Sequence, residues 1–202
     1  MEYLILGFFT GLSLILAIGA QNIFVIEQGL KKQHIFLVCF VCSVSDLILI
    51  FLGIFLFHYF IQYFNSTIEL IFNILLITFL IYFIYSKIKS FNLKVNFNEE
   101  VPNISKFKIL LKALGFTYLN PHVYSDTVFF LGNFSKNFIL NQKMLFGLGA
   151  SIASFVFFFV IGYLSKYLSH YAQNEKVWKI INIFIISFMS LLTIFVILET
   201  IN

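Results

Sequence analysis

The sequence contains no arginine and few charged residues of any kind. All 13 strongly basic residues are lysines, and charged residues make up 11% of the 202-residue chain, against about 25% in an average soluble domain. Hydrophobic residues make up 60% of the chain, and the mean hydropathy is +0.97. Because a soluble fold of this size cannot bury that much apolar surface, the composition predicts an integral membrane protein.

Cysteines and metal-binding clusters are also scarce. The two cysteines, Cys39 and Cys42, form a C-x-x-C pair inside an apolar stretch. We expect them to pack as small hydrophobic residues, with a transmembrane thiol–disulfide carrier as the alternative. The sequence lacks the clusters of His, Cys or acidic residues that favour a dedicated metal site, so we expect no metal. We also expect no cofactor and no enzymatic activity. The lysines are scattered over short loops, which does not favour nucleic acid as a partner.

Six apolar stretches follow one another along the chain, each near the roughly 20 residues that a helix needs to span a bilayer. They are residues 3–26, 35–60, 68–86, 108–132, 143–165 and 177–198. The first is too long for the apolar core of a signal peptide and follows Glu2 rather than basic residues, so we expect it in the mature protein. The predicted fold is all-α: a polytopic membrane helical bundle that forms a single domain, 1–202.

The lysines are distributed unevenly between the two ends of this bundle. Only Lys136 and Lys143 belong to one side, and eleven lie in or near the first, third and fifth connections. By the positive-inside rule the lysine-rich side is cytoplasmic, and six spans then place both termini outside. If one broken segment re-enters the membrane instead of spanning it, one terminus changes side.

A weak internal repeat divides the chain into halves 1–86 and 107–202, joined by a cytoplasmic linker, 87–106. Similar pieces recur in matching segments: Ala17–Asn22 (AIGAQN) with Tyr118–His122 (YLNPH), and Ser43–Gly53 with Ala150–Gly162. Three helices in each half give two copies of opposite orientation. Interrupted helices at matching places in inverted halves are typical of the midplane binding site of a transporter. We therefore predict a 3+3 inverted repeat in which helices one and four are broken.

Two aspartates lie inside apolar segments, Asp46 in segment two and Asp126 in segment four. A carboxylate near the bilayer centre costs about 3 kcal/mol on insertion scales, so both are candidates for a functional site. A neutral acid that only joins two helices by a hydrogen bond is the alternative. The face of the helix that carries Asp46 is mostly small or polar and should point into the bundle. It consists of Cys39, Cys42, Ser43, Asp46, Ile50 and Gly53.

Asn120 and Pro121 interrupt segment four. Proline lacks an amide hydrogen and clashes with the preceding turn, which leaves backbone carbonyls unpaired. In a membrane such backbone is tolerated where protein packs against it or where it lines a cavity. Asn120 can bond one freed group, and Gln21 and Asn22 supply two amides at the matching place in segment one. A kink without a binding site is the alternative.

Further polar and small residues accompany these motifs. His122 and Asp126 are four residues apart and would be neighbours on a continued helix, where His122 either relays a proton or orients Asp126 by a hydrogen bond. Glu27 is expected as a charge at a helix end or an entrance, with a direct role in the site as the alternative. Gly7 and Gly11 form a G-x-x-x-G pair, which indicates close packing against another helix.

At these residues the sequence resembles the bacterial basic amino acid exporters, the LysE/ArgO group. The resemblance extends over essentially the whole chain, and its matching pieces are Leu14–His34, Cys42–Phe55 and Thr117–Gly132. The run N-P-H-V-Y-x-D-T is the most specific part, because it favours this group over related exporters of neutral amino acids. Two positions depart from the pattern: Ala20 stands where the family usually has the proline of G-P-Q-N, and Tyr118 stands where tryptophan is expected.

The resemblance implies a secondary active exporter of L-lysine or L-arginine in the bacterial inner membrane. The family's motif aspartates correspond to Asp46 and Asp126, and its amide motifs to Gln21–Asn22 and Asn120–Pro121. We expect the aspartates, with His122, to exchange a cationic amino acid for a proton. Substrate, protons and the lipid bilayer are then the partners, and a homo-oligomer is left open. An exporter of another small solute or of a divalent metal, and a purely structural membrane subunit, are the alternatives.

Overall fold

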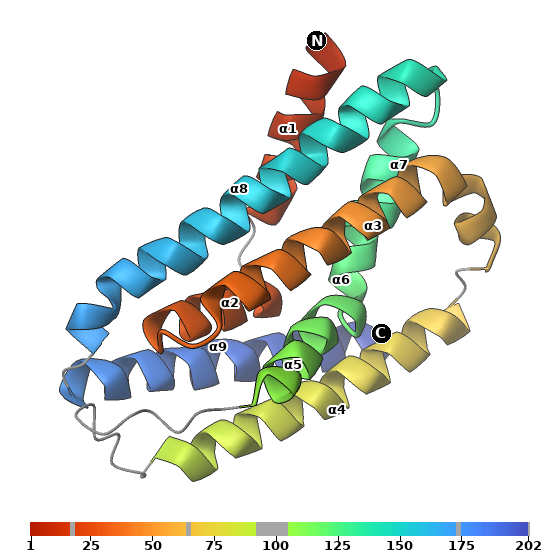
Figure 1. Ribbon diagram of the computed structural model, residues 1–202. Helices are drawn as coiled ribbons and strands as arrows, with labels where there is room; N and C mark the ends of the chain where they lie inside the picture. The colour runs from red at the N-terminus through yellow and green to blue at the C-terminus, as the bar shows by residue number, and fades with distance from the viewer. Residues whose placement is uncertain (17–18, 64–65, 92–104, 173–174, 202) are drawn as a thin grey trace.

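The fold consists of helices throughout the part of the chain that the computed structural model describes, which is residues 1–16, 19–63, 66–91, 105–172 and 175–201 (Figure 1). The first half contains α1 (Glu2–Ile15), α2 (Ala20–Leu30), α3 (Ile35–Tyr63) and α4 (Ser66–Phe91). The second half contains α5 (Lys106–Tyr118), α6 (Pro121–Tyr124), the π-helix η1 (Ser125–Phe130), α7 (Leu131–Phe134), α8 (Leu140–Ala172) and α9 (Glu175–Ile201).

Each of the six predicted apolar segments coincides with one of these helices or with a broken series of them. Helices α3, α8 and α9 are long and apolar enough to cross a membrane unbroken, and α1 with α2 forms a bent pair that meets the same test. Helix α4 contains a shorter apolar run, Asn73–Tyr85, and the fourth predicted segment is divided among α5, α6, η1 and α7. The predicted polytopic helical bundle is therefore confirmed.

The two halves pack on each other in matching pairs. Helices α3 and α8 lie side by side, and α4 packs against α9. Helices α1 and α2 pack on α8, while α5, η1 and α7 pack on α3. In both halves, therefore, the broken first helix contacts the second helix of the other half. This pattern agrees with an inverted repeat, and the division into halves remains a prediction.

Glycines bring the backbones of α1 and α8 into direct contact. A Cβ added at Gly7 would lie 2.0 Å from the carbonyl oxygen of Phe146, and one added at Gly149 would lie 2.0 Å from the carbonyl oxygen of Leu4. Neither helix could carry a side chain at these points without moving away. The close packing that the G-x-x-x-G pair predicted is confirmed, with α8 as the partner helix.

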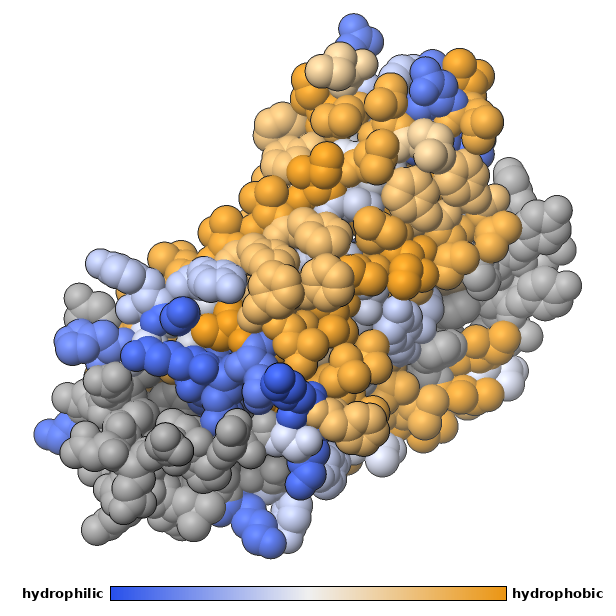
Figure 2. Space-filling view, viewed as in Figure 1, coloured by the Kyte–Doolittle hydropathy of each residue, from blue (hydrophilic) through white to orange (hydrophobic). Residues whose placement is uncertain are grey.

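The predicted inward face of α3 is buried along its whole length, from Cys39 to Gly53. Residues on the opposite face are large, apolar and exposed, for example Phe36, Phe40 and Phe55. Figure 2 shows the result on the surface: a broad apolar band, with hydrophilic residues gathered beyond it at the lower left and at the top. An apolar band between two polar ends is the surface that a bilayer requires.

Three lysine-bearing connections lie at the same end of the bundle. The turn from α2 to α3, the end of α4 with the start of α5, and the end of α8 with the start of α9 are all at the lower left of Figure 1. The N-terminus and the connection from α7 to α8 lie at the opposite end. We call the former the lysine-rich end. Within the predicted linker and AIGAQN motif, residues 92–104 and 17–18 lie outside the described residues.

Candidate functional site

The first helix is broken where the amide motif predicted, although Ala20 replaces the proline of the family pattern. Helix α1 ends at Ile15, α2 begins at Ala20, and their axes differ by 82°. The side-chain amide of Asn22 donates a hydrogen bond to the carbonyl oxygen of Ile15 at 3.0 Å. Asn22 therefore satisfies one of the carbonyl groups that the end of α1 leaves unpaired.

At the second break, between α5 and α6, side chains likewise bond the backbone groups that the break leaves unpaired. Pro121 is the first residue of α6, a position where a missing amide hydrogen costs nothing. The backbone amide of His122 donates to the side-chain oxygen of Asn120 at 3.1 Å, and the hydroxyl of Tyr124 donates to the carbonyl oxygen of Tyr118 at 3.0 Å. In an unbroken helix the His122 amide would itself bond the Tyr118 carbonyl. Asn120 and Tyr124 thus take over the two groups that the break separates.

A π-helical segment, η1, continues the chain after α6 and carries Asp126 and Thr127. The Thr127 hydroxyl donates to the carbonyl oxygen of Val123 at 2.6 Å. Short π-helical turns widen a helix locally and are frequent at functional sites. The sequence prediction assumed an ordinary helix between His122 and Asp126, so the π-helix is a feature that the spacing did not reveal.

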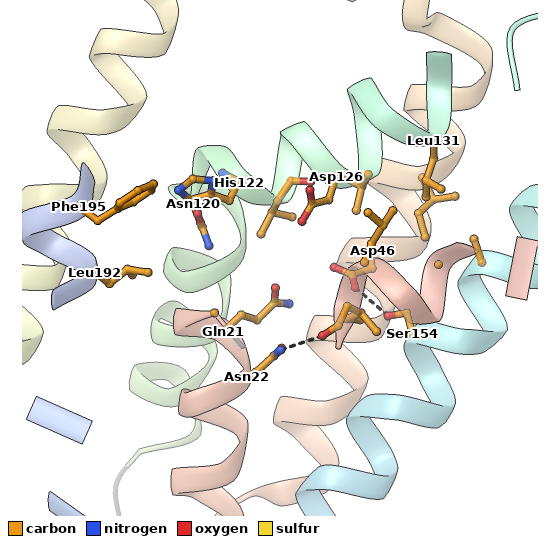
Figure 3. A pocket seen from close by; sticks show the side chains of 18 residues that line it. Gln21, Asn22, Asp46, Asn120, His122, Asp126, Leu131, Ser154, Leu192 and Phe195 are labelled. Carbon is orange, nitrogen blue, oxygen red and sulfur yellow. Dashed lines mark hydrogen bonds between the residues drawn. The ribbon is translucent and has the colours of Figure 1, made fainter. Parts of the chain in front are cut away.

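A cavity of about 250 Å³ lies between the two breaks. Figure 3 shows polar side chains entering it from opposite sides, from α2 on one side and from α6 and η1 on the other, with α9 closing a third side. Its lining residues are Gly11, Leu14, Ile15, Gly19, Gln21, Asn22, Asp46, Ile50, Asn120, His122, Val123, Asp126, Thr127, Leu131, Ala150, Ser154, Leu192 and Phe195. The volume is just below the roughly 300 Å³ at which pockets for drug-sized ligands begin, so a smaller molecule fits.

Asp46 is the most enclosed charged group in this cavity, with 4% of its surface exposed. Its Oδ2 accepts a hydrogen bond of 2.8 Å from the Ser154 hydroxyl of α8, which is drawn in Figure 3. Among the described residues, its Oδ1 has no hydrogen-bond partner, and neither has the side-chain nitrogen of Gln21. The Gln21 side chain is close enough to Asp46 to interact with its carboxyl group. The carboxyl oxygen of Asp46 and the side-chain nitrogen of Gln21 could therefore accept and donate hydrogen bonds to a ligand in the same part of the cavity.

The ionisable groups that line the cavity are two carboxyl groups and one imidazole. Asp46 and Asp126 interact electrostatically across it, and His122 interacts with Asp126. No lysine occurs among the described residues that line the space. When both carboxyl groups are ionised, such a set of groups attracts cations, because two carboxylates outweigh one imidazole in a region of low dielectric constant.

Comparison with known proteins places this arrangement in a family. The sequence model of the family described as LysE type translocator matches residues 12–200 of this chain. The chain belongs to the LysE type translocator family. The arginine exporter protein ArgO of Pectobacterium carotovorum is 33% identical over 188 residues, which cover 89% of this chain and 88% of the relative. ArgO of Salmonella typhimurium is 33% identical over 195 residues, 92% and 88% of the two chains. No solved structure matches.

Family membership and the apolar helices together make this LysE-family chain a multi-pass protein of the bacterial inner membrane. The curated relatives carry the names of transporters, not of enzymes. The resemblance to the LysE/ArgO group that the motifs indicated is confirmed.

Six of the seven predicted site residues of this LysE-family protein line one cavity, and the seventh, Pro121, begins the helix that enters it. The six are Gln21, Asn22, Asp46, Asn120, His122 and Asp126. Sequence reasoning missed Ser154 and the α9 residues Leu192 and Phe195. Ser154 lies in the segment-five piece that matches the Asp46 region, so the repeat could have indicated it. No sequence signal points to Leu192 or Phe195.

The cysteines of this LysE-family protein do not line the cavity, although Cys42 lies next to the lining residues Gln21 and Asp46. Cys39 and Cys42 are both free, fully buried and on the same helix, α3. The thiol of Cys39 donates to the carbonyl oxygen of Phe158 on α8 at 3.2 Å. Within the described ranges, no group of three or more His, Cys, Asp or Glu side chains is arranged to hold a metal ion.

Glu27 lies in the interior of this LysE-family protein, closer to the lysine-rich end than the cavity is. It is 2% exposed and forms an ion pair with Lys31, the residue that follows the last residue of α2. It does not line the cavity.

Proposed function

We propose that this protein is a secondary active exporter of cationic amino acids, L-arginine or L-lysine, driven by proton antiport. The observation that carries the proposal is the cavity itself, which Asp46 and Asp126 both line, between two broken helices. The names of the relatives, which are arginine exporters, support a basic amino acid as the substrate.

The two aspartates form an alternating site for a cation. Asp46, whose Oδ1 has no partner, receives the ammonium or guanidinium group or the α-ammonium group of the substrate. Asp126, with His122 beside it, carries the proton. Which aspartate takes which role follows from their surroundings: Asp46 is enclosed and held in place by Ser154, whereas Asp126 is half-buried next to an imidazole.

The substrate carboxylate lies at the start of α2. Helix α2 begins at Ala20 and has no side-chain cap, because Gly19 precedes it. The positive end of the helix dipole therefore lies at this point, and it favours an anion. The Gln21 side-chain nitrogen, buried without a partner, is a further donor at this end. The carboxylate of a basic amino acid would therefore bind at the start of α2, and its cationic groups would bind at the aspartates.

Coupling to protons follows from the charge of the substrate. A cation that leaves the cytoplasm moves against a potential that is negative inside, which costs about 2.3 kcal/mol per charge per 100 mV. Exchange of one cationic amino acid for one proton moves no net charge. A carboxylate that holds either a proton or the substrate cation, and not both, enforces this exchange.

The inverted repeat supplies the conformational change. Halves 1–86 and 107–202 pack through α3 with α8 and α4 with α9, and each broken helix packs on the other half. Rocking of one half against the other would expose the cavity to each side in turn. The lysine-rich end is the cytoplasmic end in this proposal.

The test is efflux from cells that have been loaded with dipeptides containing a single basic amino acid. Asp46→Asn and Asp126→Asn keep the shape of each side chain and remove the charge, so both should abolish efflux while the protein still inserts. Glu2→Gln, at an exposed position in α1, is the matched control and should export normally. A protonophore should stop net export by the unaltered protein. Normal efflux in either aspartate variant would disprove the assignment of the site.

The same assay addresses the thiol–disulfide alternative. Replacing Cys39 and Cys42 together by alanine should leave efflux intact, since both cysteines lie in the core and outside the cavity. Loss of efflux in a variant that inserts normally would favour the redox carrier instead.

A further inference from the structure

A charged group lies beyond the cavity, on the side of the lysine-rich end. Glu27 follows Asn22 on α2 by five residues, which is about 7.5 Å along a helix axis. It is buried, it is ion-paired with Lys31, and Lys112 of α5 lies within electrostatic reach of it. A substrate that enters from the lysine-rich end would meet Glu27 before it meets Asp46.

The two helices that approach the cavity carry the same kinds of residue in the same order. From the cavity toward the lysine-rich end, α2 presents Asn22, then Phe24, then Glu27. The segment formed by α5 and Asn120 presents an amide, then Phe116, then Lys112 in the same direction, because α5 runs the opposite way. Helices α2 and α5 contact each other. The two segments therefore form three successive layers: an amide layer (Asn22 and Asn120), an aromatic layer (Phe24 and Phe116) and a charged layer (Glu27 and Lys112).

The aromatic layer lies between the cavity and Glu27. Phe24 and Phe116 are completely buried, with ring centroids 4.9 Å apart. Two rings of α4, those of Phe79 and Phe83, pack on Phe116 at 4.8 Å and 5.0 Å. Neither Phe24 nor Phe116 lines the cavity. In this conformation the packed rings separate Glu27 from the aspartates.

The ion pair of Glu27 and Lys31 is not explained by stability. A buried ion pair is usually no more stabilising than apolar residues of the same size, but removing one partner leaves an uncompensated buried charge. Lys112 already compensates part of the Glu27 charge, and a cation that replaces Lys31 restores the rest. The ammonium group of a lysine side chain is the same chemical group as that of free lysine, and a guanidinium group binds a carboxylate still better.

We propose that Glu27 is a recruiting site for the cationic group of a basic amino acid, with the ammonium group of Lys31 as its occupant when substrate is absent. This inference rests on the proposed function. The substrate cation displaces Lys31, whose side chain is 23% exposed and turns to solvent. Lys112 opposes the presence of a second cation beside Glu27, so the substrate does not remain there. Once the rings of Phe24 and Phe116 separate, the cation passes to Asp46.

The experiment measures uptake of radiolabelled arginine and lysine into membrane vesicles of both orientations, so that substrate meets either the lysine-rich end or the opposite end. In Glu27→Gln, the KM at the lysine-rich end should rise about tenfold, the change that 1.4 kcal/mol produces. The KM at the other end should stay as in the unaltered protein. Glu27→Asp should restore most of the affinity, and Glu2→Gln should change neither value.

A double variant separates recruitment from folding. Glu27→Gln with Lys31→Gln removes both charges, so no unpaired charge stays buried. If Glu27 recruits substrate, the double variant still shows the raised KM at the lysine-rich end. If Glu27 serves only to neutralise Lys31, the double variant returns to the KM of the unaltered protein, and the proposal is wrong. An unchanged KM at both ends in Glu27→Gln overturns it as well.

Failure of the proposed function would look different. In that case the unaltered protein would transport neither arginine nor lysine in vesicles of either orientation. Transport that depends on Asp46 but is indifferent to Glu27 would leave the proposed function standing and remove only the recruiting site.

Discussion

The contact between α1 and α8 leads to a prediction that can be worked out from distances. Gly7→Ala places a methyl carbon 2.0 Å from the carbonyl oxygen of Phe146, whereas carbon and oxygen atoms in close contact usually lie about 3.3 Å apart. Helix α1 must therefore move by about 1.3 Å or deform. Overpacking of this kind costs about 1–3 kcal/mol. Since α1 also carries Gly11 and Leu14 into the cavity, we expect both the stability and the rate of efflux to fall.

Gly19→Ala is the matched control, because it adds the same methyl group to the same broken segment. A Cβ at Gly19 would meet no atom within 4 Å, and the backbone there is extended, with φ −117° and ψ −179°. The assay is the thermal unfolding of the detergent-solubilised protein, followed by the amount that remains monodisperse in size-exclusion chromatography. Gly7→Ala should unfold several degrees below Gly19→Ala. Equal unfolding temperatures would refute the direct backbone contact between α1 and α8.

Two further predictions concern hydrogen bonds at the cavity. Ser154→Ala removes the hydroxyl that bonds Asp46 Oδ2; since a hydrogen bond to a charged group contributes about 1.5–3 kcal/mol, efflux should fall at least tenfold. Ser151→Ala, whose hydroxyl bonds the Gly147 carbonyl of its own helix, should export normally, and equal losses in the two variants would contradict a role for Ser154 in positioning Asp46. Tyr124→Phe removes the bond to the Tyr118 carbonyl at the second break and should lower stability by about 1 kcal/mol. Tyr167→Phe, at a residue that is 79% exposed, should leave the unfolding temperature unchanged, and an unchanged Tyr124→Phe would show that another group satisfies that carbonyl.

The amino-acid sequence alone determined which segments are helical and which faces of them are buried. The inward face of α3, from Cys39 to Gly53, was predictable because a helix repeats its environment every three or four residues. The second break was predictable because proline cannot donate a backbone hydrogen bond. Asp46 and Asp126 stood out because a carboxylate is costly in an apolar segment. Each of these signals is local to one helix.

Only the tertiary structure decided which of these residues meet. Asp46 and Ser154 are separated by 108 positions in the chain, and their hydrogen bond exists because α3 and α8 pack side by side. The backbone contact of α1 with α8 and the presence of Leu192 and Phe195 in the cavity likewise depend on packing between helices. Helical periodicity reports that a face is buried, but it carries no information on the helix that buries it. The cavity between the two halves is therefore a property of the assembled bundle.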